Sequence, residues 1–339
     1  MPDAARAAHG ATRGRIVAAL LALYLIWGST YLAIRFAIET IPPFMMAGAR
    51  FVAAGLVLWV FASVRGWTPR WPTAREWGAA AIVGGLLLLG GNGAVVWAEQ
   101  RVPSGIAALL VATVPLWMVL VDWARPGGRR PSLGVAVGLL LGLAGLMLLV
   151  GLDGLRGTGG VDLAGAIVLT FGSITWAIGS IYSKRLPLPK HPIAATGLEM
   201  LCGGVLLFAF AAAVGEFGTF DPSAVSTRSL LAWGYLFTFG SLIGFTAYIW
   251  LLGVVSPAKA STYAYVNPVV AVLLGWALAN EPLTPRMFVA AAVIIAAVAL
   301  ITVAQGAERP ATTPAASPSP DERPRGRKSR KRSRPARAA

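Results

Sequence analysis

Charged residues, cysteine and histidine are all scarce in this sequence. Only 13% of the 339 residues are charged, whereas water-soluble domains carry about 25%. The single cysteine, Cys202, excludes an intrachain disulfide and a cysteine-based metal site. The two histidines, His9 and His191, lie outside the apolar segments, which excludes histidine chemistry at membrane depth. We therefore expect no metal and no cofactor.

Apolar residues are what the sequence has in abundance. Hydrophobic residues make up 56% of the chain, and the mean hydropathy is +0.69. The net charge of +15 could suggest a nucleic-acid partner, but the surplus lies in short loops and in one tail. Basic loops beside membrane spans have a simpler cause in the topology of membrane insertion. The composition indicates a multi-span membrane protein whose partners are the lipid bilayer and a small molecule, with no nucleic acid.

Ten apolar segments are long enough to cross the bilayer, which takes roughly 20 residues per helix. Each break between them carries a proline, a glycine cluster or charged residues. The predicted spans are 16–38, 43–64, 77–98, 104–122, 133–152, 161–183, 193–214, 230–252, 258–279 and 284–304.

Lysine and arginine predict the orientation of the spans, because they concentrate in cytoplasmic loops. Three alternate loops are basic, at 65–75, 125–130 and 184–190, whereas the intervening loops are mainly acidic. We expect both termini to be cytoplasmic. Residues 1–15 form the first tail, and residues 305–339 form a Pro/Ser-rich, basic tail that we expect to be disordered. Contact with anionic lipid and a solvated topology anchor both stay open for that tail.

The two halves of the chain are related by sequence. "WGSTYLAIRFA" from Trp27 aligns with "WAIGSIYSKRL" from Trp176. "VWAEQRVPSGIAALLVATVPLW" aligns with "IWLLGVVSPAKASTYAYVNPVV". In these two registers the matched pairs are Trp27 and Trp176, Pro43 and Pro192, Trp97 and Trp250, and Pro115 and Pro268.

Each half has an odd number of spans, so the second half should enter the membrane in the opposite orientation to the first. The predicted fold class is therefore an all-α polytopic membrane protein of ten transmembrane helices, built as two inverted five-helix repeats. The repeats cover residues 16–152 and 161–304. Secondary transporters are commonly built this way, with the substrate site between the halves near the midplane.

Polar and aromatic stripes along the spans predict the lining of that site. Tyr24, Trp27, Tyr31 and Arg35 share one helix face. The second half repeats this stripe from Ser173 to Lys184, and helix packing is the alternative for both. Span nine carries a further stripe from Lys259 to Val270. The candidate substrate-binding residues are Tyr24, Trp27, Tyr31, Asn92, Trp176, Ser180, Tyr263 and Asn267.

Span nine also contains Pro268 at membrane depth. Since proline removes one backbone hydrogen bond, it predicts a discontinuous helix there. Its counterpart in span four offers only apolar residues beside Pro115, so we expect the polar contacts to come from the second half.

Three charged residues are candidates for ion coupling. Arg50 lies inside span two, Glu199 lies at the equivalent place in span seven, and Glu99 follows span three. Charges at membrane depth are functional candidates by default. Glu199 is the leading proton carrier, with a structural ion pair or a snorkelling side chain as the alternative. Arg50 is expected to pair with Glu99 or to hold a substrate carboxylate.

Spans five and ten are rich in small residues and predict packing rather than lining. Gly134, Gly138 and Gly142 form small-xxx-small steps. Such a surface serves either helix packing within the chain or a homodimer.

Several motifs together resemble a known family. They are "LYLIWGSTYLAIR", "PPFMMAGARF", "VPSGIAALLVATVPLW", "GSITWAIGSIYSKR" and "SPAKASTYAYVNPVVAVLLGW". Their order and spacing resemble the drug/metabolite transporter (DMT) superfamily, in particular its ten-span exporters with two EamA domains, of the YedA type. The resemblance covers residues 16–304 and implies a bacterial inner-membrane protein that exports small metabolites such as amino acids, or toxic compounds and drugs.

The leading hypothesis is a secondary exporter of small metabolites that works by alternating access. The chain has no ATP-binding P-loop motif, so an ion or solute gradient, including a proton gradient, should supply the energy. The alternatives are a facilitator or uptake carrier, a non-transporting scaffold, and an intramembrane enzyme. The enzyme would need paired His, Asp or Cys residues at membrane depth, which are absent from the spans, so we expect no enzymatic activity.

Overall fold

The computed structural model describes residues 12–68, 70–128, 130–155, 161–255 and 263–307. Most of the two predicted tails, and Lys259, lie outside these ranges. Within the described residues the regular structure is entirely helical. Nine helical stretches there are long and apolar enough to cross a membrane, and a tenth apolar stretch, Val266–Ala279, is shorter. The predicted all-α polytopic fold is confirmed.

The elements follow the predicted spans closely, and segment 43–64 has the bounds of its helix. In chain order they are α2 (Arg13–Ala37), α3 (Pro43–Val64), α4 (Ala74–Gly84), η1 (Gly85–Asn92), α5 (Gly93–Ala98), α6 (Ser104–Val111), α7 (Val114–Ala124), α8 (Leu133–Leu155), α9 (Leu163–Ser183), α10 (Pro192–Ala213), α11 (Glu216–Thr219), η2 (Pro222–Ala224), α12 (Thr227–Tyr235), η3 (Leu236–Ile243), α13 (Gly244–Val254), α15 (Tyr263–Ala279) and α16 (Pro285–Ala307). The segments η1 and η3 are π-helical. Each lies within one continuous span.

The sequence supplies the residues that start these helices. Pro43 and Pro192 are the first residues of α3 and α10, where the missing N–H is not needed because the first turn has no acceptor for it. Thr73 and Glu76 form a reciprocal capping box at the start of α4. Asp162 accepts a hydrogen bond from the Gly165 amide and so caps α9.

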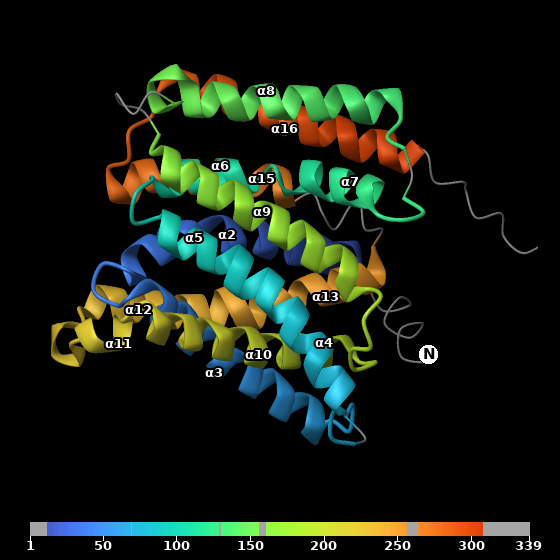
Figure 1. The fold of residues 1–339 in the computed structure, drawn as a ribbon, viewed down its shortest axis with the longest axis vertical. Coiled ribbons are helices and arrows are strands. Elements are labelled where there is room, and N and C mark those ends of the chain that lie inside the picture. The colour runs from blue at the N-terminus through green and yellow to red at the C-terminus, as the bar shows by residue number, and fades with distance from the viewer. Residues whose placement is uncertain (1–11, 69, 129, 156–160, 256–262, 308–339) are drawn as a thin grey trace, which may run out of the picture.

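The helices form a bundle in which α8 and α16 pack side by side along one edge (Figure 1). The opposite edge is formed by α3 and α4, and α3 packs along α10. Between the two edges, α2 packs against α15, α12 and α13, and α9 packs against η1, α5 and α7. The interior of the bundle therefore lies around α2 and α9, the first span of each half.

Glycines bring α3 and α10 into backbone contact. A Cβ added at Gly55 would lie 2.6 Å from the Leu201 nitrogen and 2.7 Å from the Gly197 oxygen. A Cβ added at Gly48 would lie 3.2 Å from the Gly204 oxygen. Gly48 meets Gly204 and Gly55, further along α3, meets Gly197, which comes earlier in α10. The two helices therefore run antiparallel. The register that aligns Trp27 with Trp176 also aligns Gly48 with Gly197 and Gly55 with Gly204.

Small residues join α8 to α16 in the same manner, as the sequence predicted for packing helices. A Cβ at Gly138 would lie 3.1 Å from the Ala297 oxygen and 2.6 Å from the Ile301 side chain. A Cβ at Gly145 would lie 2.8 Å from Ile294. These helices are also antiparallel, and the glycines face the partner helix within the chain.

The helix interruption is not in the span where the sequence predicted it. In the described part of span nine, α15 continues through Pro268. Span four is interrupted instead, because α6 ends at Val111 and α7 begins at Val114, next to Pro115. At the interruption Thr113 donates to the Leu110 carbonyl at 2.6 Å, and the Trp117 indole donates to the Thr113 hydroxyl at 3.1 Å. The prediction of a discontinuous span nine was wrong, and the first half also supplies polar groups.

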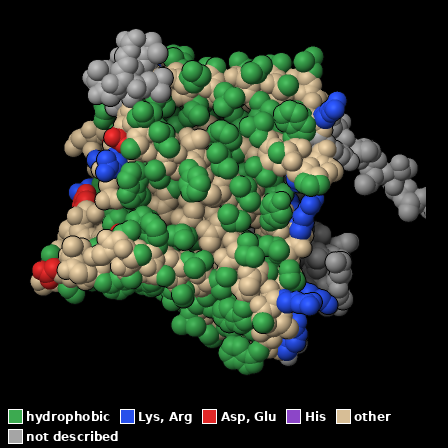
Figure 2. Space-filling model, in the orientation of Figure 1, with side chains coloured by type: hydrophobic (Ala, Val, Ile, Leu, Met, Phe, Trp, Pro, Cys, Tyr) green, Lys and Arg blue, Asp and Glu red, His purple; other side chains and the backbone are tan. Residues whose placement is uncertain are grey.

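The two ends of the bundle differ in charge. On the face shown in Figure 2, Asp and Glu lie only along the left edge, where Lys or Arg lies among them, whereas the right edge carries Lys and Arg without Asp or Glu. We call the end that holds loops 38–42, 99–103, 214–226 and 280–284 the acidic end, and the end that holds loops 65–73, 125–132 and 184–191 the basic end. Between the ends, large apolar side chains such as Leu140 and Leu231 face outward. This apolar belt suits a hydrocarbon surround.

Candidate functional site

The π-helical segments η1 and η3 lie where the central helices meet. A π-turn inserts one extra residue into a helix and frequently marks a functional site. Trp176 of α9 packs on Gly91 of η1, where a Cβ would lie 2.7 Å from its ring. Trp27 of α2 packs against Gly244, at the end of η3, where a Cβ would collide with the indole nitrogen. The register that aligns Trp97 with Trp250 also aligns Gly91 with Gly244.

Aromatic rings gather around Trp27. Its ring centroid lies 5.4 Å from that of Phe245, 5.3 Å from that of Tyr248 and 4.9 Å from that of Tyr263. The indole N–H donates to the Gly240 carbonyl at 3.3 Å. We call Trp27, Phe245, Tyr248 and Tyr263 the aromatic cluster. It joins α2, α13 and α15, and its edge-to-face pairs use the favourable geometry of aromatic contacts.

Asn267 ties the same helices together. In the orientation that satisfies both the oxygen and the nitrogen of its side-chain amide, the nitrogen donates to the Tyr263 carbonyl at 3.1 Å and to the Tyr24 carbonyl at 3.2 Å. Asn267 is buried, so these bonds offset the cost of burying an amide. The candidate residues Tyr24, Trp27, Tyr263 and Asn267 therefore lie together between α2 and α15.

A second polar group lies between α3 and η1. The Arg50 guanidinium donates to the Asn92 side-chain oxygen at 2.9 Å and lies 4.1 Å from the centroid of the Phe51 ring. Arg50 is buried. The expected ion pair with Glu99 does not form within 4 Å among the described residues, where Asn92 takes that place. Two candidates from different spans, Arg50 and Asn92, are thus brought together.

Glu281 organises the acidic end of the bundle. Its carboxylate accepts hydrogen bonds from the Ser104 amide at 2.8 Å and the Gly105 amide at 3.1 Å, and so caps α6. Arg35 of α2 lies 3.5 Å from the same carboxylate. Glu281 is 5% exposed. Negative charge at a helix N-terminus is favourable, and this one side chain joins α2, α6 and the end of α15.

Glu99 lies beside this junction, one residue beyond the end of its span at Ala98. It is only 2% exposed, and within the described part of the chain neither carboxylate oxygen has a hydrogen-bond partner. Burial raises the pKa of Glu99 well above its usual range. The nearby charge of Glu281 raises this pKa further, whereas Arg35 and Arg50 oppose the shift.

The remaining candidates are Glu199, Ser180 and Tyr31, of which Tyr31 lies within electrostatic range of Glu99 and Tyr263. Glu199 of α10 is half-buried, and the structure records no hydrogen bond or ion pair of its carboxylate within the described residues. Ser180 lies near the basic end of α9, where its carbonyl accepts from Ser183 at 3.0 Å. Tyr31 of α2 packs against the main apolar core.

Sequence reasoning missed several residues of this interior. Phe245 and Tyr248 complete the aromatic cluster, and Arg35, which the sequence placed on the stripe of the first span, pairs with Glu281. Glu281 stands beside Pro282 in the sequence, but its partners Ser104 and Arg35 are far away along the chain. The repeat register could have found Gly244, because it aligns this residue with Gly91.

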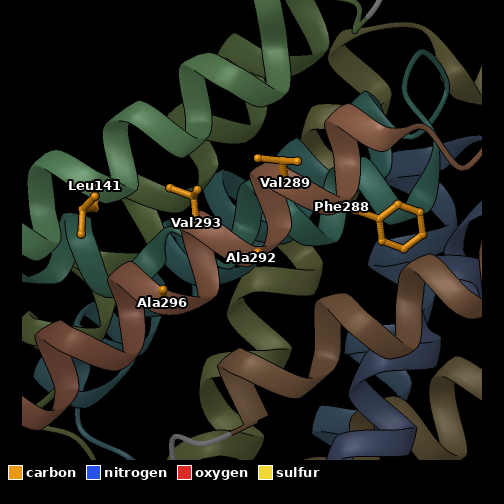
Figure 3. Close-up of a pocket in the computed structure, with 6 residues that line it drawn as sticks. All are labelled: Leu141, Phe288, Val289, Ala292, Val293 and Ala296. Atoms are coloured by element: carbon orange, nitrogen blue, oxygen red, sulfur yellow. The ribbon is translucent and has the colours of Figure 1, made fainter.

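The pocket drawn in Figure 3 contains none of the candidate residues. It has a volume of about 490 Å³ and lies on the α8–α16 pair, and its lining residues are Leu141, Phe288, Val289, Ala292, Val293 and Ala296. All six are apolar, so this hollow offers no hydrogen bond to a polar ligand. Within the described residues, no group of three His, Cys, Asp or Glu side chains is placed to hold a metal ion.

Two related five-helix halves around a polar and aromatic interior define a polytopic membrane protein of the transporter type. The model of the EamA-like transporter family matches residues 14–151 and 163–303. The chain therefore belongs to the EamA-like transporter family, with one copy of the domain in each half. This confirms the resemblance to the DMT superfamily.

Individual proteins show the same relationship. The inner membrane transporter YedA of Escherichia coli (strain K12) is 47% identical over 285 residues, which are 84% of this chain and 89% of YedA. The transporter YoaV of Bacillus subtilis (strain 168) is 25% identical over 286 residues, which are 83% of this chain and 94% of YoaV. A crystal structure superposes with a TM-score of 0.57 at 22% identity, covering 88% of this chain and all of that chain, and supports the fold alone.

Proposed function

We propose that this chain is a secondary transporter that exports small amphipathic metabolites by alternating access. Its two halves, 16–152 and 161–304, act as inverted repeats in a bacterial inner membrane, and both termini are cytoplasmic. The observation that carries the proposal is the antiparallel contact of α3 with α10 through aligned glycines. Two helices at the same place in a repeat that run in opposite directions are what an inverted repeat requires.

The paired tryptophans give the proposal independent support. Trp27 and Trp176 are aligned in one register, and the glycines they pack on, Gly244 and Gly91, are aligned in the other. Each half thus offers the same ring-on-glycine contact to the other. Two similar contacts across the interior suit a mechanism in which the halves rock against one another around a central site.

The aromatic cluster favours substrates with a flat apolar part. The ring centroids of Trp27 and Tyr263 lie 4.9 Å apart, and these rings offer stacking surfaces. Asn267 adds polar contacts through its amide, and Arg50 adds them through its guanidinium. Aromatic rings bind flat groups and cations through their faces. We propose aromatic amino acids and flat organic cations as substrates, with Tyr24, Tyr31, Asn92, Trp176 and Ser180 as further lining.

Efflux from proteoliposomes tests both the activity and the lining. Vesicles loaded with mixed amino acids and organic cations are followed with and without a proton gradient. We expect gradient-driven efflux. Efflux at the same rate with and without the gradient would indicate a facilitator or exchanger. Net uptake of the compounds into the vesicles in place of efflux would indicate an uptake carrier.

Substitutions of Tyr263 sharpen this test. Tyr263→Ala should reduce efflux of aromatic substrates more than that of aliphatic ones, because it removes a ring from the aromatic cluster. Tyr263→Phe should retain transport, since it keeps the ring. Tyr182→Ala is the matched control, because Tyr182 is 40% exposed and lies in α9, which contributes no residue to the cluster. Equal losses for both substrate classes would contradict stacking as the basis of selection.

A further inference from the structure

Glu99 is a buried carboxyl group without a bonding partner in the described part of the chain. Both of its oxygens are shut off from solvent. The charged and titratable groups within electrostatic range are Tyr31 and Arg35 of α2, Arg50 of α3, and Glu281 after α15. The helix α9 also packs on α5, and its titratable side chain Tyr182 lies at its opposite end, while η1 contributes none.

The neighbouring cations are already engaged elsewhere. Arg50 donates to Asn92 at 2.9 Å, and Arg35 lies 3.5 Å from Glu281. An ionised carboxylate that is buried without a donor is costly, and such a group takes up a proton instead. A proton is also the ligand that fits, because it needs no cavity beside the two enclosed oxygens.

Glu99 is the first residue of the loop to α6, and Glu281 caps the N-terminus of α6. Opening the acidic end would bring water to Glu99 and release its proton to the solution. The resulting carboxylate would then compete with Glu281 for Arg35. The closed state thus has a protonated Glu99 and the Arg35–Glu281 pair, and the open state has an ionised Glu99, one free proton and a weakened Arg35–Glu281 pair.

We propose that Glu99 is the proton-binding group of this transporter and that its protonation is the condition for closing the acidic end around Arg35 and Glu281. The inference rests on the proposed secondary transport, and the proposed orientation puts the acidic end outside. A proton taken from the outside lets the empty carrier close that end after the substrate has left, and the proton returns to the outside when that end opens again. Glu99 thus makes closure of the outer end depend on the outside pH, and Glu199 has no part in this closure.

Thiol accessibility at the acidic end tests this proposal without a substrate. The chain has one cysteine, so Cys202→Ala gives a background for single reporters. Ala37→Cys and Val102→Cys each place a reporter at a position that is buried at the acidic end. Full-length protein in liposomes is labelled with a membrane-impermeant maleimide at about pH 5.5 and about pH 8, the titration range of a raised carboxyl. Rates are normalised to Ser223→Cys in the exposed loop before α12, which corrects for thiol ionisation.

We expect normalised labelling to rise about fivefold or more at the higher pH, because each pH unit changes the ratio of ionised to protonated carboxyl about tenfold. With Glu99→Gln, labelling should stay low at both pH values, whereas Glu199→Gln should keep the rise. An unchanged rise in Glu99→Gln, or no rise in the parent, would overturn the proposal. A rise lost only in Glu199→Gln would assign the proton to Glu199.

The two proposals fail in different ways. Labelling that does not respond to Glu99→Gln overturns the proton assignment and leaves export untouched. Labelling that responds, in a protein that moves none of the loaded compounds, overturns the proposed substrates while the proton assignment stands.

Discussion

Gly55→Ala is expected to destabilise the protein through one defined contact. The added methyl carbon would lie 2.6 Å from the Leu201 nitrogen, 2.7 Å from the Gly197 oxygen and 3.0 Å from the Leu201 side chain. The two nearest atoms belong to the backbone of α10, so no side-chain rotation can make room. The helices α3 and α10 must move apart, which loosens the longest helix contact between the two halves.

The size of the effect follows from two opposing terms. Inserting an extra methyl group into a tight contact costs about 1–3 kcal/mol, and contact with backbone places this case near the upper value. Alanine regains about 1 kcal/mol over glycine through its helix propensity. The expected net loss is therefore about 2 kcal/mol in the free energy of unfolding. That corresponds to a midpoint about 4–8 °C lower, at about 2–4 °C per kcal/mol.

Thermal unfolding of the purified protein in detergent measures this loss, and Gly78→Ala is the matched control. Gly78 lies in α4, and nothing lies within 4 Å of a Cβ added there. This control should gain up to about 1 kcal/mol from helix propensity alone. A double substitution at Gly55 and Gly197 should cost less than the sum of the two, because both act on one contact. A double substitution at Gly55 and Gly204 should be closer to additive, since seven helical residues, about 10 Å, separate the two contacts.

Two results would refute this reasoning. If Gly55→Ala unfolds at the wild-type temperature, α3 and α10 do not meet through backbone at this position. If Gly78→Ala loses as much stability as Gly55→Ala, the loss comes from the removal of glycine and not from the helix contact.

Two further predictions concern the acidic end. Glu281→Ala leaves the Ser104 and Gly105 amides without their acceptor and should lower the free energy of unfolding by about 2–6 kcal/mol, at about 1–3 kcal/mol per orphaned group. Glu281→Gln should restore part of this loss in the same thermal assay, and equal losses in both variants would contradict the capping role. Because the folded pKa of Glu99 is raised above 4.5, the folded protein keeps a proton that the unfolded chain releases. As the pH rises from about 4.5 to the folded pKa, the free energy of unfolding should fall by up to about 1.4 kcal/mol per pH unit. Thermal unfolding midpoints measured across this pH range should show the decrease in the wild type and not in Glu99→Gln.

The spans were predictable because each is a long apolar run bounded by residues that end helices. Pro43 and Pro192 begin α3 and α10, and segment 43–64 has the observed bounds. The lipid environment makes this possible, since every buried backbone group must be bonded within its own helix. The pattern of one segment therefore nearly determines its structure.

The discontinuous helix was not predictable from a single segment. Pro115 and Pro268 are equivalent in sequence, yet α15 continues through Pro268 and span four is interrupted before Pro115. Whether a helix tolerates proline depends on which neighbours satisfy the freed backbone groups. The side chains near the two prolines also differ in their bonds: Asn267 donates to the Tyr263 and Tyr24 carbonyls, whereas Thr113 donates to the Leu110 carbonyl at the interruption.

The charge contacts were also beyond the sequence. The sequence offers Arg50 two candidate partners close together, Asn92 inside span three and Glu99 just after it. Only the packing of η1 on the neighbouring helices places Asn92 at hydrogen-bond distance. Arg35 and Glu281 are 246 residues apart in the sequence, and periodicity within a span carries no information on which spans are neighbours. The repeat register gives equivalence of positions, which is a different property from contact.

The two halves share their packing and differ in their charges, and this difference bears on which of the two states the carrier occupies. Trp27 on Gly244 and Trp176 on Gly91 are the same contact made twice, but Arg50 aligns with Glu199 and Arg35 aligns with Lys184. Two inverted halves with the same packing would open to either side at nearly equal free energy. Glu99, Arg35 and Glu281 lie at one end only, so a proton concentration on that side acts on one of the two states. Since a ligand shifts an equilibrium only by its differential affinity for the two states, the asymmetric charges, and not the repeated packing, let the outside pH change the populations of the two states.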